Sequence, residues 1–259
     1  MSDDLLSIVV VATDLLAVAA VLTGLSFALR RACFPETRHW RVLLAVAVVV
    51  LAWYGLTTVL AMRDVFLVSA AVTFPALPVA VLVPIAVGTV VLLRSRTASA
   101  ALDATPLSWL VGVQVYRVVG VIFLLLWAAG SLPGEFALPA GIGDMLTGLG
   151  AATLAPAIAR GDRNTRAAAY LWNAFGLLDF VVALATGFLT SPGPFHLLAL
   201  DNPNLMATAY PLAMIPTFVV PFTTLLHVLC LWKLRRMANQ DVTASSADAS
   251  ARPVPAASP

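Results

Sequence analysis

Residues 107–129 read LSWLVGVQVYRVVGVIFLLLWAA, and this stretch decides the fold class. Arg117 is its only charged residue, and the run is long enough to cross the hydrocarbon core of a membrane, which takes about 20 apolar residues in a helix. Because backbone groups cannot stay unpaired in lipid, such a run is expected to be α-helical. The stretch therefore predicts a transmembrane helix with a charge near its middle.

The rest of the chain has the composition of an integral membrane protein. Of 259 residues, 61% are hydrophobic and 11% are charged, with 15 basic residues, 13 acidic residues and two cysteines. These values exclude a disordered chain, a nucleic-acid-binding module and a disulfide scaffold. We expect an all-α polytopic membrane protein whose surroundings are the lipid bilayer, with no nucleic-acid partner.

Seven stretches have the length and apolar character of a membrane span. They are residues 7–29, 42–62, 65–93, 107–129, 136–158, 167–189 and 210–231. The third is overlong and carries Pro75, Pro78 and Pro84, so it either crosses throughout or crosses only from about Ala76. The prediction is a seven-helix transmembrane domain over residues 1–237 and a disordered cytoplasmic tail over residues 238–259.

Basic residues set the expected orientation. With the N-terminus outside and the C-terminus cytoplasmic, every Lys and Arg except Arg63 and Arg117 falls in a cytoplasmic loop or in the tail. The N-terminal Met-Ser-Asp-Asp lacks the basic residues of a signal peptide, so the first span is expected to remain. Much Ala, Val, Gly and Arg is typical of a GC-rich bacterium, which predicts the inner (plasma) membrane.

The span count also permits a 3+1+3 parallel repeat, in which the first and fifth spans run in the same direction. Asp14 and Asp144 lie early in these two spans, and Arg30 and Arg160 follow them at the same offset. The plan resembles that of the SWEET and PQ-loop transporters, although the chain has no Pro-Gln dipeptide. The alternative is that helices of similar length place charges at similar spacings without any repeat.

Five ionisable residues lie inside the spans, and each marks a functional site because a charge in lipid is costly. They are Asp14, Arg117, Asp144, Asp179 and His227. At about 1.5 Å per residue from the outer end of each span, the aspartates and Arg117 fall in one layer. His227 and Asn173 fall in a second, inner layer, about 25 Å deep.

The outer layer predicts a binding site. One arginine against three aspartates leaves a negative formal charge if all four are ionised. Either carboxyl groups hold protons, or a cation or a cationic group of a substrate supplies the missing charge. The alternative is that Arg117 pairs with Asp144 or Asp179 only to lock helices together, while Asp14 reaches water.

These observations favour a transporter of a small solute or ion. A transporter that couples this movement to protons is the most specific version of the hypothesis. The expected outward-opening polar cavity is lined by Asp14, Gln114, Tyr116, Arg117, Asp144 and Asp179. In this hypothesis Asp144 or Asp179 carries a proton or cation, and Arg117 contacts an anionic group or holds one carboxylate. Asn173 and His227 form an inner relay. The chain predicts no cofactor and no metal site, and it leaves a homo-oligomer open.

Two other functions remain open at this stage. Gly141-Ile142-Gly143-Asp144 resembles the GxGD motif of intramembrane aspartyl proteases, and Pro75-Ala76-Leu77 matches their PAL tripeptide. The resemblance implies that Asp144 and Asp179 form a catalytic pair that activates water. Against it, the second aspartate follows GxGD and PAL precedes it. The third candidate is a non-catalytic membrane subunit or sensor; apart from the protease, we expect no enzyme.

Overall fold

The computed structural model describes residues 3–67, 76–193 and 195–251, and every regular element in these ranges is helical. The elements are α1 (Asp3–Arg31), α2 (Glu36–Met62), α3 (Ala76–Arg94), α4 (Arg96–Ala104), α5 (Leu107–Gly112), η1 (Val113–Gly120), α6 (Val121–Ala128), α7 (Gly134–Arg160), α8 (Thr165–Thr190), η2 (Ile215–Val219) and α9 (Val220–Ala251). Among the described residues, seven helical segments are long and apolar enough to cross a membrane. The prediction of an all-α protein with seven such segments is confirmed.

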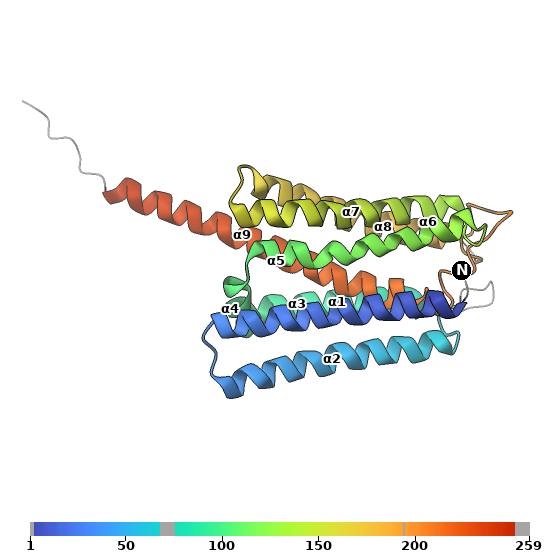
Figure 1. Ribbon diagram of the computed structural model, residues 1–259, viewed down its shortest axis with the longest axis horizontal. Helices are drawn as coiled ribbons and strands as arrows, with labels where there is room; N and C mark the ends of the chain where they lie inside the picture. The colour runs from blue at the N-terminus through green and yellow to red at the C-terminus, as the bar shows by residue number, and fades with distance from the viewer. Residues whose placement is uncertain (1–2, 68–75, 194, 252–259) are drawn as a thin grey trace, which may run out of the picture.

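The helices form a long bundle (Figure 1). The N-terminus lies at one end, and α9 leaves the bundle at the opposite end. The connection between α8 and α9 lies at the same end as the N-terminus. This arrangement agrees with an odd number of crossings; which end faces the cytoplasm stays a prediction, as does the 3+1+3 repeat.

The seventh span begins later than predicted. The sequence places its start at Tyr210, but the residues before Met214 form turns and the helical segment starts at Ile215. Pro211 explains this difference, because a proline disfavours helical backbone at the residue before it. The shift changes the depth of every residue that follows.

The other end of α9 extends past Ala238, where the sequence places the start of the tail, and the helix continues to Ala251. That the tail is disordered and cytoplasmic stays a prediction. In the third span, Pro75 and with it the start of the PAL tripeptide lie outside the described residues, while α3 is helical from Ala76 onward.

The short helix α4 was missed by the sequence reasoning. Ser95 caps its first turn, because its Oγ accepts a hydrogen bond from the backbone N–H of Ala98 at 3.1 Å. At the other end, Lys233 of α9 donates to the carbonyl oxygens of Leu102 and Asp103 at 3.0 and 2.8 Å. These bonds tie the connection between the third and fourth spans to α9.

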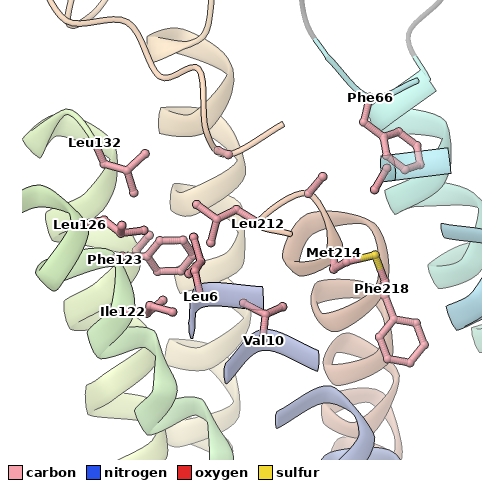
Figure 2. Close-up of a cluster of buried hydrophobic side chains, with 14 of the residues drawn as sticks. Leu6, Val10, Phe66, Ile122, Phe123, Leu126, Leu132, Leu212, Met214 and Phe218 are labelled. Atoms are coloured by element: carbon pink, nitrogen blue, oxygen red, sulfur yellow. The ribbon is translucent and has the colours of Figure 1, made fainter. Parts of the chain in front are cut away.

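The main apolar core lies toward the end of the bundle that holds the N-terminus. Figure 2 shows Leu6 and Val10 of α1, Phe123 of α6, and Leu212 and Phe218 meeting there from separate elements. Because these side chains come from both ends of the sequence, the core joins the first helix to the last span. One face of this core borders the polar residues described next.

Candidate functional site

The fourth span contains a 3₁₀ segment, η1, between the α-helical turns of α5 and α6. A 3₁₀ helix has three residues per turn, so residues three apart share one face. Gln114, Arg117 and Gly120 occupy that face, and all three are buried. Since η1 packs closely along α7, this geometry directs Arg117 into the bundle instead of toward lipid.

Arg117 holds two carboxylates at once. Its Nε donates to Oδ1 of Asp144 at 2.8 Å, and its Nη2 donates to Oδ2 of Asp179 at 2.5 Å. The Arg117 side chain is 1% exposed, against 18% for Asp144 and 5% for Asp179. The structure thus joins η1, α7 and α8 through one buried guanidinium. Of the two roles expected for Arg117, holding a carboxylate is the one that this geometry displays.

The remaining nitrogen of the guanidinium connects this pair to α9. Nη1 of Arg117 lies 3.1 Å from Nε2 of His227 and donates to the carbonyl oxygen of Gly176 at 3.5 Å. Because Arg117 can only donate, Nε2 of His227 accepts, and the Nδ1–H of His227 then donates to Oδ1 of Asn173 at 2.9 Å. The hydrogen bonds therefore fix one tautomer of a neutral imidazole.

The predicted grouping of His227 with Asn173 is present, but the separation of this inner pair from Arg117 is wrong, since His227 contacts Arg117 directly. The error lies in the assumed start of the seventh span. Counting about 1.5 Å per residue from Ile215 instead of Tyr210 places His227 about 18 Å deep, level with Arg117. We call the five residues Arg117, Asp144, Asp179, His227 and Asn173 the Arg117 cluster.

Glycines make room for the Arg117 cluster. A Cβ on Gly176 would lie 2.6 Å from Cε1 of His227 and 3.0 Å from Nη1 of Arg117. A Cβ on Gly143 would overlap Oδ1 of Asp179, and one on Gly120 would overlap the Asp144 side chain. Each of these distances is shorter than real side-chain contacts allow. The cluster can therefore form only because these three positions are glycine.

A cavity extends from the two carboxylates toward one end of the bundle. Asp144 and Asp179 line it at one end, and Ser191, Ala207 and Thr208 line it near the connection between α8 and α9. The space not filled by atoms is about 700 Å³, including its open mouth. The end that holds this connection also holds the N-terminus, which is the predicted outer side (Figure 1).

A second cavity lies on the other side of Asp144, against α1. Asp14, Tyr116, Arg117 and Asp144 line it together. Asp14 is only 3% exposed, and its Oδ2 atom has no hydrogen-bond partner in the described structure. The expectation that Asp14 reaches water is therefore wrong. Its helix packs against η1, which covers it.

The single polar cavity expected from the sequence is replaced by these two adjoining cavities with largely apolar walls. Gln114 lines neither of them: it is fully buried, and neither atom of its amide group has a partner in the described structure. Tyr116 lines the second cavity and shares a hydrogen bond with the hydroxyl group of Thr223 on α9.

A family model matches residues 74–235 of the chain. Its description is "Domain of unknown function (DUF8737)", and the match covers more than half of the sequence. The chain belongs to the DUF8737 family. The matched region contains the whole Arg117 cluster, whereas Asp14 and the first two helices precede it. Neither the search of curated proteins nor the search of solved structures found a match.

In this DUF8737 chain, the glycines of the GxGD-like stretch serve helix packing. Gly143 lies against Asp179, and a Cβ on Gly141 would lie 2.7 Å from the Leu124 side chain of α6. Asp144 and Asp179 are joined through the guanidinium of Arg117, whereas aspartyl proteases place two carboxylates around a shared proton and water. The protease hypothesis stays untested, and this arrangement does not favour it.

Sequence reasoning missed the aromatic and small residues that shape the cluster. The guanidinium carbon of Arg117 lies 4.0 Å from the centre of the Phe180 ring, and the Trp172 ring packs 5.0 Å from that of His227. Phe180 directly follows Asp179, so proximity in sequence was a signal for it. Gly176 lies one helical turn before Phe180, and a Cβ there would meet His227.

Proposed function

We propose that this protein transports a small solute or ion across the bacterial inner membrane and couples that movement to protons. The observation that carries the proposal is the Arg117 cluster, whose two carboxylates line a cavity. Charged groups at membrane depth are rare, and they commonly mark the path of an ion, a proton or a substrate. In the proposed orientation the N-terminus is outside, and the cavity extends toward that side, where Ser191 and Thr208 line it.

The charge of the cluster supports this function. Two carboxylates face one guanidinium, so the ionised cluster carries one negative charge in excess. In a medium of low dielectric constant, a proton or a bound cation balances that charge. A site that binds a proton and a cation in turn could couple the movement of one to the movement of the other, as proton-coupled exchange requires. Asp144 is the residue placed to alternate, because it lines both cavities.

The irregular helices support movement around the site. η1 is a 3₁₀ segment in the fourth span, and η2 is a π-helical segment in the seventh. Transporters commonly place binding sites beside interrupted helices, whose backbones adjust more readily than regular α-helix. Both segments adjoin the second cavity, through Arg117 of η1 and Ile215 of η2. In the proposed cycle they change shape as Asp144 exchanges its proton.

Proteoliposomes test the proposal. Purified protein is reconstituted with an entrapped pH-sensitive dye, and inorganic cations, organic amines, amino acids or sugars are added outside. Transport coupled to protons predicts that members of one class change the internal pH. The Asp144→Asn variant, which cannot exchange a proton at this position, is expected to lose that response.

Asp201→Asn is the matched control, because Asp201 is an exposed acid outside both cavities. It should respond like the wild type. Inserted, folded protein that moves no protons with any of the four solute classes would contradict the proposal. So would a full response from the Asp144→Asn variant.

A further inference from the structure

The wall of the outer cavity is apolar and rich in phenylalanine. Its side chains between mouth and base include Phe123, Phe136, Phe180, Leu184, Phe188 and Val220. Phe123 and Phe136 pack edge to face with ring centres 5.4 Å apart, and both line the cavity. Such a wall favours the apolar body of an organic molecule, because a hydrated inorganic ion would find few oxygen ligands there.

The base of this cavity is anionic. Arg117 occupies Oδ1 of Asp144 and Oδ2 of Asp179, and in the described part of the chain neither Oδ2 of Asp144 nor Oδ1 of Asp179 accepts a further hydrogen bond. Asp144 and Asp179 line the outer cavity, whereas Arg117 lines only the second one. The charged residues that line the outer cavity are therefore both acidic.

Arg117 has little left to offer an anion. Its Nε, Nη1 and Nη2 all donate hydrogen bonds within the cluster, and Phe180 covers one face of the guanidinium. An anionic ligand would have to break these bonds and approach two carboxylates. A cationic ligand needs no such change.

Asp14 is an independent indication that the site suits a positively charged ligand. Its carboxylate is nine-tenths or more buried, has an unpartnered oxygen and lines the second cavity beside Asp144. Asp144 thus lies between two spaces that both carry carboxylates. The electrostatic potential at this point attracts a cation from either side.

We infer that the transported solute is a small organic cation with an apolar body, such as an arylalkyl ammonium ion. Its charge binds at Asp144 and Asp179, and its body packs against the phenylalanines of the outer cavity, where cation–π attraction adds to apolar contact. This inference rests on the proposed transport function and specifies its substrate class.

Isothermal titration calorimetry of the purified full chain in nanodiscs tests the inference with four probes. Benzyltrimethylammonium has both the charge and the apolar body. Tetramethylammonium has the charge alone, N,N-dimethylbenzamide has a similar body without charge, and phenylacetate has the opposite charge. Benzyltrimethylammonium is expected to bind about tenfold or more tightly than each of the other three, because each lacks one attraction or reverses it.

Two pairs of variants assign the site. Asp144→Asn removes the charge and is expected to weaken benzyltrimethylammonium binding about tenfold or more, with Asp201→Asn as its unchanged control. Ala183→Phe places a ring in the outer cavity, changes no residue of the Arg117 cluster, and is expected to abolish binding. Ala185→Phe adds the same ring two residues along α8 at an exposed position, so it should bind like wild type.

The outcomes separate this inference from the proposed function. The inference is overturned if all four probes bind equally or if none binds. It is also overturned if phenylacetate or the amide is preferred, or if tetramethylammonium binds as tightly as benzyltrimethylammonium. Full binding by Ala183→Phe overturns it as well. If another solute class then drives proton movement in proteoliposomes, the transport proposal stands alone. If benzyltrimethylammonium binds as expected but no solute moves protons, the cation site stands and the transport proposal fails.

Discussion

The helices α2 and α8 are both apolar enough to cross a membrane, yet α2 lies at the edge of the bundle and α8 is more deeply buried in it. α2 is the more apolar, but only 6% of its most hydrophobic window is buried in the protein, against 33% for α8. α8 carries Asp179 and Gly176, whose contacts lie inside the bundle, while α2 packs mainly along α1. Hydropathy therefore places a helix in the membrane, whereas charges and small residues decide which helix reaches the centre.

Removal of Arg117 should have the largest effect on stability. Arg117→Met leaves two buried carboxylates without their cation, and breaking such a pair typically costs about 3–5 kcal/mol. Arg63→Met, at the exposed end of α2, should change the free energy of unfolding little. Titration of SDS into dodecylmaltoside micelles, followed by far-ultraviolet circular dichroism, measures both. Equal effects at the two sites would contradict the central role of Arg117.

A triple variant sharpens this result. Combining Arg117→Met with Asp144→Asn and Asp179→Asn removes every formal charge that contacts the guanidinium. Because a neutral replacement leaves no unpaired charge, most of the stability lost in Arg117→Met should return. A triple variant that folds well but moves no protons would separate the functional role of the cluster from its structural role. Continued solute-driven proton movement in that variant would argue that the cluster only stabilises the fold.

Glycine substitution should have the next largest effect. Gly143→Ala places a methyl group where Asp179 lies, and overpacking of this kind costs about 1–3 kcal/mol. Gly55→Ala is the matched change on α2, where nothing lies within 4 Å of the new methyl group. It should leave the unfolding free energy unchanged or raise it slightly, because alanine favours helix. The same SDS titration measures the pair, and a more harmful Gly55→Ala would reverse the comparison.

Histidine substitution should have the smallest effect. His227→Leu removes hydrogen bonds to Arg117 and Asn173 and leaves both groups buried, for a loss of about 1–3 kcal/mol. His39 of α2 is also buried, but within the described ranges its side chain bonds only to Oγ of Ser26, at 3.2 Å, so His39→Leu should cost about 1 kcal/mol or less. Thermal unfolding in micelles ranks the two, and a greater loss from His39→Leu would contradict this ranking.

The sequence predicted the grouping of Arg117, Asp144 and Asp179 because depth along a regular helix follows directly from residue number. It failed for His227, since a turn before Ile215 moved the start of the seventh span. It failed for Gln114 for another reason: whether a polar group on a helix faces a cavity, a neighbour or water depends on rotation about the helix axis. In η1 the 3₁₀ geometry changes that rotation.

By itself the sequence determined the all-helical class, the seven apolar segments and the presence of charges at membrane depth. These follow from local composition and from the length that a helix needs to cross lipid. Only the tertiary structure decided that Arg117 holds two carboxylates and a histidine at once, and that an apolar cavity ends at Asp144. The reason is that such contacts join residues far apart in the chain, and helix register and close glycine packing set them, not the composition of any one segment.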